Sequence, residues 1–434
     1  MAVAERAQHG HPGPEWSIPR SSVVSWVLYD LANTIFSLSI VSLYFSLWVV
    51  DAMGGSDRLY GNVNSISMAL MFFTAPIIGA LSDQMPRRMP FLIVSTLVCV
   101  SLTFFLGTGG LVTSLVLFGL ANYFFQAGFI FYDALLPEVS TEENRGRVGG
   151  LGVGVGYLGS IIAILGGRLL LPENPTPDDY RSVFQLTALL FLGFALPAFF
   201  FVRERPRRVA SIGLRSLGRA FTEIGHTVRR AGRYPGLGRF LIGRAFYADA
   251  ANTLIVFMSI YVTQELGFTT TEAQYLLLAT IPAAVVGGLV WGVVVDRLGP
   301  KRTLNMVLLL WLVVLALAVA IPVLGLPTAL IWVAGALAGI ALGGLWTADR
   351  PYMLRLTPPR YLGQFYGLYS MVGRFAAIVG PVLWGLIVTT LGWGRPAAVA
   401  SLLVLVAIAY VILRGVSDEP RVWGPDDLVE REVA

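Results

Sequence analysis

The sequence predicts an all-α polytopic membrane protein with twelve transmembrane helices, built as two similar six-helix halves. Hydrophobic residues make up 56% of the 434 residues and charged residues 13%, about half the charged share of a soluble domain. Apolar runs of about 20 residues, the length at which a helix spans a bilayer, recur between short polar breaks. Three stretches of the first half also reappear in the second half. Together these observations predict a duplicated helical bundle in lipid.

Six spans are expected in each half, each bounded by charged residues, glycine or proline. In the first half they are 23–50, 60–82, 90–108, 111–136, 148–171 and 182–202. In the second half they are 239–264, 272–295, 303–323, 328–349, 363–391 and 395–414. Helices are expected because backbone groups in lipid must pair within their own segment, and the runs are about twice as long as barrel strands.

The distribution of arginine and lysine predicts the orientation of the bundle. Alternate loops carry the basic residues, and the loops between them carry almost none. Because basic loops stay on the cytoplasmic side, we expect both termini in the cytoplasm and the protein in the cytoplasmic membrane of a prokaryote. Topology thus accounts for the net charge of +5, and no nucleic-acid partner is expected.

Two six-helix domains, 1–202 and 239–416, are expected, with a cytoplasmic tail at 417–434. The arginine-rich stretch 203–238 is expected to link them along the anionic inner leaflet, with an amphipathic helix at 214–228. Residues 1–20 lack the regions of a cleavable signal peptide, so the first span is expected to direct insertion. We expect a monomer whose partners are the lipid bilayer and a small-molecule substrate.

Metal, cofactor and enzyme chemistry are not expected. His9, His11 and His226 lie outside the spans, and Cys99 is the single cysteine. The spans therefore offer no metal cluster and no nucleophile–base pair built on these residues. The glycine-rich stretch 149–159 lacks the lysine of an ATP-binding loop, so transport would draw on a gradient.

An internal repeat shows at three places with an offset of 213 to 219 residues. In the first and seventh spans the same spacing joins two sets of residues: Asp30, Asn33 and Thr34, and Asp249, Asn252 and Thr253. The loop 79–88 matches the loop 292–302, and Asp133 matches Asp349. Because each half has six spans, the halves share one topology and are related by an axis along the membrane normal.

The repeated loop resembles a signature of the major facilitator superfamily. The second copy carries its full pattern: Gly292, Asp296, Arg297, Gly299, Lys301 and Arg302. The first copy keeps Gly79, Asp83, Arg87 and Arg88, with Gln84 and Pro86 where arginine and glycine are usual. Within the superfamily, the runs 29–36, 131–138 and 246–253 are similar to the vacuole-effluxer-like family. This resemblance implies the twelve-helix fold, alternating access, and amino acids as the favoured substrate class.

Ionisable and amide residues set inside spans predict the pathway, because a charge in lipid is costly unless it faces a wet cavity. The candidate pathway residues are Asp30, Asn33, Asp249, Asn252, Arg374, Asn122, Gln126 and Trp346. For the two Asp–Asn pairs, an interdomain latch, with Arg244 as a candidate partner, and a substrate or proton site both remain open. Arg374 is expected to anchor a substrate carboxylate or to pair with an aspartate. Asn122, Gln126 and Trp346 are expected in the cavity, with ordinary packing as the alternative.

Charged residues at the ends of spans predict gates. The candidate gate residues are Asp83, Arg87, Arg88, Asp133, Arg145, Asp296, Arg297, Arg302 and Asp349. For Asp133 and Asp349 a structural clamp with the basic loops is favoured over substrate contact. Asp296 is predicted to hold a cytoplasm-closed arrangement with nearby arginines.

The function expected is secondary active transport of a small solute by alternating access, coupled to protons, with amino acids or related metabolites favoured. Asp30, Asp249 and Arg374 are expected to form its chemical centre. A cation-coupled sugar carrier and a drug/proton antiporter remain the alternatives among carriers. A channel or receptor would fit the composition, but duplicated halves with gate-like loops favour a carrier.

Overall fold

The apolar runs form helices in the computed structural model. The structure describes residues 17–173, 175–207, 229, 231–417, 419 and 421–428. In the first half the helices are α2 (Arg20–Phe36), α3 (Tyr44–Leu47), α4 (Asp57–Asp83), α5 (Met89–Phe104), α6 (Gly110–Ala134), α7 (Leu136–Val139), α8 (Arg145–Leu170) and α9 (Pro177–Phe201). In the second half they are α12 (Leu237–Glu265), α13 (Thr270–Leu298), α14 (Pro300–Val323), α15 (Leu330–Leu356), α16 (Leu362–Gly385) and α17 (Arg395–Arg414).

The described residues confirm the all-helical membrane fold. Eleven helical segments are long and apolar enough to cross a bilayer, and the expected span 90–108 is the shorter apolar helix α5. The first span is continuous through two π-helical stretches, η1 (Ser37–Leu43) and η2 (Trp48–Ala52). The amphipathic helix expected at 214–228 and most of the linker lie outside the described residues.

Local sequence sets several of the helix ends. Thr176 and Thr269 begin α9 and α13 with capping boxes, in which each threonine exchanges hydrogen bonds with the acidic residue three positions later. Gly299 lies between α13 and α14 with φ of +85°, a backbone conformation that favours glycine. Because Gly299 alone connects them, α13 and α14 are successive antiparallel helices.

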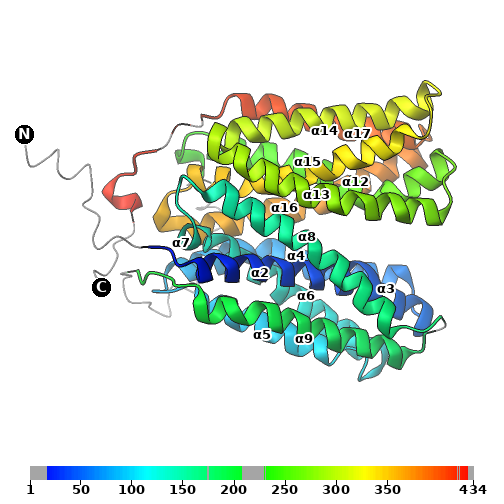
Figure 1. The fold of residues 1–434 in the computed structure, drawn as a ribbon, viewed down its shortest axis with the longest axis horizontal. Helices are drawn as coiled ribbons and strands as arrows, with labels where there is room; N and C mark the ends of the chain where they lie inside the picture. The colour runs from blue at the N-terminus through cyan, green and yellow to red at the C-terminus, as the bar shows by residue number, and fades with distance from the viewer. Residues whose placement is uncertain are drawn as a thin grey trace, which may run out of the picture.

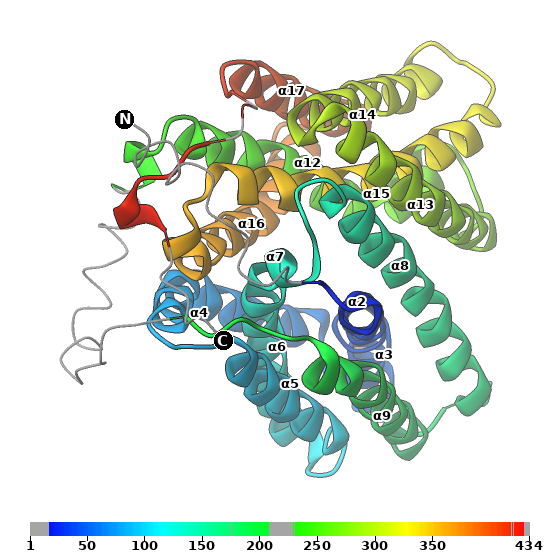
Figure 2. The ribbon, with the colours of Figure 1, turned by 60° about the vertical axis from the view of Figure 1, so that its left-hand side comes forward.

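The two halves lie side by side, α2–α9 against α12–α17 (Figure 1). They meet mainly where α8 packs on α13 and α4 packs on α16, as the turned view also shows (Figure 2). We call the end of the bundle at which α9 ends and α12 begins the linker end. The connections α4–α5, α6–α8, α13–α14 and α15–α16 all lie there.

Glycines bring the halves together near the linker end. A Cβ on Gly150 of α8 would lie 2.8 Å from the Cα of Gly292 on α13, and one on Gly292 would lie 2.8 Å from the carbonyl oxygen of Gly146. Since Gly146 and Gly150 are four residues apart, they present a smooth stripe on one face of α8. Small residues of this kind allow close helix approach in lipid.

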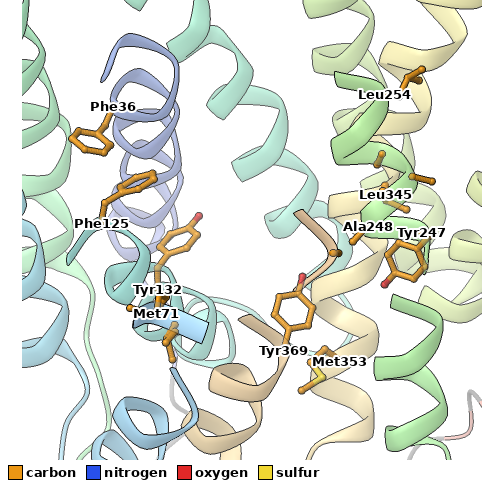
Figure 3. Packing of buried hydrophobic residues seen from close by; sticks show 14 of the residues in the cluster. Phe36, Met71, Phe125, Tyr132, Tyr247, Ala248, Leu254, Leu345, Met353 and Tyr369 are labelled. Carbon is orange, nitrogen blue, oxygen red and sulfur yellow. The ribbon is translucent and has the colours of Figure 1, made fainter. Parts of the chain in front are cut away.

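Aromatic side chains pack between α2 and α6, the helices that carry Asp30 and Asp133. The rings of Trp26 and Tyr132 stack with centroids 4.4 Å apart, and the indole of Trp26 donates to the Tyr132 carbonyl oxygen. Phe36 on α2 and Phe125 on α6 face each other with centroids 4.5 Å apart (Figure 3). These contacts fix α2 against α6, so the side chains beside them have defined positions.

Candidate functional site

An arginine of the second half reaches two aspartates of the first half. The guanidinium of Arg350, on α15, lies 3.3 Å from Asp30 of α2 and 3.1 Å from Asp133 of α6. The exposed fraction of each of the three side chains is 11% or less. A buried pair of this kind is costly to break, because each partner would be left charged away from water. One cation therefore serves two carboxylates across the interface between the halves.

A second buried ion pair lies within the second half. Arg244 of α12 donates to Asp349 of α15 at 3.2 Å, and its guanidinium lies 3.4 Å from the ring centroid of Tyr369. The hydroxyls of Tyr247 and Tyr369 donate to the same carboxylate at 2.7 and 2.8 Å. Asp349, which is fully buried, thus has a cation and two hydroxyl donors from its own half.

A cavity of about 350 Å³ lies between the halves beside these ion pairs. Both halves line it, through α2, α6 and α8 on one side and α12, α15 and α16 on the other. It reaches from Asp30 on α2 to Ser37 at the start of η1, which is the direction away from the linker end. Aromatic side chains form much of its wall: Phe125, Phe129, Tyr157, Trp346 and Tyr369. The cavity therefore combines charged side chains at the end nearer the linker with an aromatic wall that offers both apolar and polar contacts.

Arg374 is the cation of this cavity without an ion-pair partner among the described residues. It lines the cavity from α16, and its Nε has no hydrogen-bond partner. Arg244 and Arg350 line the same cavity but are engaged by aspartates. A half-buried guanidinium of this kind is suited to a carboxylate or another planar anion.

The structure brings some of the expected pathway residues to the cavity and leaves others away from it. Asp30, Asn252, Arg374, Gln126 and Trp346 line it. Asn122 lies behind it, donating to Asn64 and accepting from Gln126 at 2.8 and 3.3 Å. Asn33 is buried, and its amide nitrogen has no partner in the described part of the chain.

Asp249 is not part of the charged centre that the sequence predicted. It is buried, does not line the cavity, and faces Gly380 of α16, where a Cβ would crowd its carboxylate. Arg244 also does not pair with it, because Arg244 is held by Asp349. The repeat places Asp249 at the position of Asp30, but the cation that Asp30 contacts has no counterpart at Asp249 among the described residues.

At the linker end, two aspartates cap helices of the opposite half. Asp296, which ends α13, accepts from the backbone N–H groups of Gly146 and Arg147 at the start of α8, at 2.6 and 3.1 Å. Asp83, which ends α4, accepts from those of Gly363 and Gln364 at the start of α16, at 2.8 and 2.7 Å. A carboxylate at a helix N-terminus pairs with free N–H groups and the positive end of the dipole. We call these two caps the linker-end latches.

Arginines add to both latches. Arg147 donates its Nε to Asp296 at 2.7 Å, while Arg88 and Arg207 donate to Asp83. Arg207 also donates to the carbonyl oxygen of Ser82 and is buried. Burial and the neighbouring Arg88 lower the pKa of Arg207 to about 10, so it remains charged at neutral pH.

Among the described residues, the other predicted gate arginines form no ion pair with Asp83 or Asp296. Arg87, Arg297 and Arg302 are exposed, and the described residues give them no ion pair. Arg145 begins α8, but its neighbour Arg147 makes the contact with Asp296. Asp133 does not clamp a basic loop as expected, because its cation is Arg350 from the opposite half.

Sequence reasoning missed Arg350, Tyr369 and Arg147. Arg350 directly follows Asp349 near a helix end where topology alone accounts for an arginine. The repeat held a signal, because at the offset that relates Asp133 to Asp349 the first half has Ala134 where the second has Arg350. A residue that breaks the repeat at the centre of the bundle is a candidate for a contact that only one half can supply.

Solved structures with the same fold are membrane transporters. The human organic anion transporter MFSD10 (TETRAN) matches with a TM-score of 0.72 and 16% identity over 92% of this chain and 99% of that one. The Escherichia coli fucose:proton symporter FucP matches with a TM-score of 0.70 and 14% identity over 91% and 97%. At such identities the likeness shows the fold. The shared fold is that of membrane transporters built from two helical halves, and in this chain the polar cavity lies between those halves.

Sequence comparison gives the family. Residues 139–420 match the family model described as "Vacuole effluxer Atg22 like". The MFS-type transporter YxiO of Bacillus subtilis is 26% identical over 91% of this chain and 94% of its own length. Autophagy-related protein 22 of Coccidioides immitis is 25% identical over 60% of this chain, and the match spans 47% of that fungal protein. The chain belongs to the vacuole effluxer Atg22-like family, as its motifs predicted.

Proposed function

We propose that this protein is a proton-coupled secondary carrier of a small zwitterionic solute, with amino acids as the favoured class. The observation that carries the proposal is the charge pattern of the cavity. Its first-half side has two carboxylates, Asp30 and Asp133, for one ion-paired arginine, whereas its second-half side has the unpaired guanidinium of Arg374. One side thus has a carboxylate in excess and the other a guanidinium in excess.

A zwitterion fits both excess charges. Its carboxylate would pair with Arg374, and its ammonium group would lie toward Asp30 and Asp133, with Asn252 and Gln126 as neutral partners. Charge-assisted hydrogen bonds of this kind are about twice as strong as neutral ones. The aromatic wall would accommodate an apolar side chain. Binding of such a solute leaves the net charge of the site unchanged.

The latches support alternating access as the mechanism. They join the halves at the linker end, while the cavity extends the other way, so the structure corresponds to a carrier closed on one side. With the linker end in the cytoplasm, as the arginine distribution predicts, this state faces outward. Opening inward would require both caps and the glycine contacts of α8 with α13 to separate.

Other carrier types account less directly for Arg374. A neutral sugar would leave the guanidinium without a partner, and a cationic drug would be repelled by it. MFSD10 is named as an organic anion transporter and FucP as a fucose:proton symporter. An organic anion is the substrate of the two that an unpaired arginine favours.

A ligand screen by thermal shift tests the proposal. Amino acids, their decarboxylated amines, their deaminated acids and sugars would be compared on purified protein and on the Arg374→Ala variant. We expect amino acids to raise the melting temperature of the parent more than either half-molecule does. The variant should lose this response to compounds with a carboxylate. Arg395→Ala, at the far end of the second half, is the matched control and should respond as the parent does. Stabilisation by sugars alone, or an unaltered response in Arg374→Ala, would contradict the proposal.

A further inference from the structure

Asp30 and Asp133 obtain their cation from the half of the protein to which they do not belong. Arg350 is on α15 of the second half, and the two carboxylates are on α2 and α6 of the first. The repeat-related carboxylate differs, because Asp349 pairs with Arg244 of its own half. At the offset that relates Asp30 to Asp249, the first half has Ser25 in place of Arg244. The first half therefore has the acids of the repeat without its arginine.

We propose that Asp30 and Asp133 together form the proton-binding site of the carrier, and that Arg350 occupies this site when the linker end is closed. The proposal deepens the proposed function, since it assumes that the halves part at the linker end during transport. When they part, α15 moves away from α2 and α6, and Arg350 moves with it. The two carboxylates then lose their cation while Trp26, Tyr132 and the rest of their own half remain packed against them.

A buried carboxylate that loses its counter-ion takes up a proton, because burial disfavours its charged form. The carboxylate takes the proton from a hydronium ion in the cavity water: one O–H bond of the hydronium ion breaks, one O–H bond forms on the carboxyl group, and a water molecule is left. Proton uptake is thus tied to opening of the linker end, and proton release to the return of Arg350. The pair Asp349 and Arg244 stays intact throughout, because both residues move with the second half.

The other charged and titratable groups around the pair do not replace Arg350. Arg244 and Arg374 belong to the second half and move with Arg350. In the described part of the chain, Arg145 of the first half forms no ion pair with either carboxylate, and its neighbours include Glu142, Tyr366 and Asp296. The tyrosines that face the pair are Tyr132 of α6, Tyr157 of α8, and Tyr366 and Tyr369 of α16. Their hydroxyls are neutral at physiological pH, so they offer hydrogen bonds but no charge.

The test measures the conformational equilibrium against pH and needs no substrate. Spin labels would be placed at Thr141 and Leu298, exposed residues on opposite halves at the linker end, in a background with Cys99→Ala. Distance distributions between the labels report the ratio of open to closed molecules. We expect this ratio to rise as the pH falls, by up to about tenfold per pH unit for each proton taken up.

Three variants and a control define the outcome. Asp133→Asn should reduce the pH slope, and the double variant Asp30→Asn with Asp133→Asn should remove it. Arg350→Gln should also flatten the slope, because the pair then lacks its cation in both states; this variant tests the idea if the double variant does not fold. Glu265→Gln removes a carboxylate that pairs with Arg395 within the second half, 3.9 Å away, and should keep the parental slope.

A double variant or an Arg350→Gln variant that keeps the parental pH slope would overturn the assignment of the proton site. A failure of the proposed function looks different. If no zwitterion binds or moves, the pH slope of the label distances still reports on the pair. If a zwitterion is carried and the parent shows no pH slope, the proton site is wrong and the substrate class stands.

Discussion

Replacement of Asp296 by asparagine should open the linker end. The carboxylate accepts two backbone N–H groups of α8 and the Nε of Arg147. Hydrogen bonds to a charged group contribute about 1.5–3 kcal/mol each, and loss of a helix cap costs about 0.5–2 kcal/mol. The ion pair with Arg147 adds at most about 1 kcal/mol, because the side chain of Arg147 is 61% exposed.

Asparagine keeps one acceptor oxygen but loses the charge, so we expect the closed state to lose about 2 kcal/mol. That loss is about 30-fold in the ratio of closed to open molecules. The spin labels at Thr141 and Leu298 measure this ratio directly. Transport should slow, while insertion and yield stay at the parental level.

Arg147→Ala is the matched control, because it removes the exposed ion pair and keeps both backbone caps. We expect it to change the ratio by less than about fivefold. An unchanged distance distribution in Asp296→Asn would refute the role of this latch. An equal effect of both variants would show that the ion pair, and not the cap on α8, closes the linker end.

Three further predictions concern packing, the second ion pair and orientation. Gly150→Ala should destabilise the closed state by about 1–3 kcal/mol, seen as a larger open population in the same label measurement, because its Cβ would lie 2.8 Å from the Cα of Gly292; parental distances would contradict it. Arg244→Ala should lower stability by about 3–5 kcal/mol, measured by thermal unfolding, because it leaves Asp349 charged and buried, and adding Asp349→Asn should restore part of the loss. A cysteine at the exposed Glu142 should react with an impermeant reagent only after cells are opened; labelling of intact cells would reverse the predicted orientation.

Most of the fold could be predicted from the sequence because lipid imposes simple rules. A spanning segment must be apolar and about 20 residues long, and its backbone must pair internally. The short helix α5 and the π-helical stretches η1 and η2 could not be predicted this way. Hydropathy fixes where a chain enters and leaves the bilayer, whereas helix ends and changes in helical pitch depend on packing.

The candidate site was predicted less completely, and Asp249 and Arg350 show why. The repeat predicts that Asp30 and Asp249 occupy equivalent positions, and it says nothing of which opposing residue each one meets. Asp30 contacts Arg350 of the other half, whereas Asp249 faces Gly380 of its own half. Contacts between the halves depend on how the two similar domains dock, and docking leaves no periodic pattern in the sequence of either half. A single sequence indicates such contacts only through residues that break the repeat, as Arg350 does.

The central claim is that a carboxylate-bearing zwitterion moves through this cavity by proton-coupled alternating access. The most direct measurement is uptake of a radiolabelled amino acid, chosen from the thermal-shift screen, into liposomes that contain the purified protein, with and without an imposed pH gradient. We predict saturable uptake that the gradient drives above equilibrium, and none of this accumulation in Arg374→Ala or in protein-free liposomes. Uptake that never exceeds equilibrium under the gradient, or accumulation by Arg374→Ala equal to that of the parent, would contradict the account.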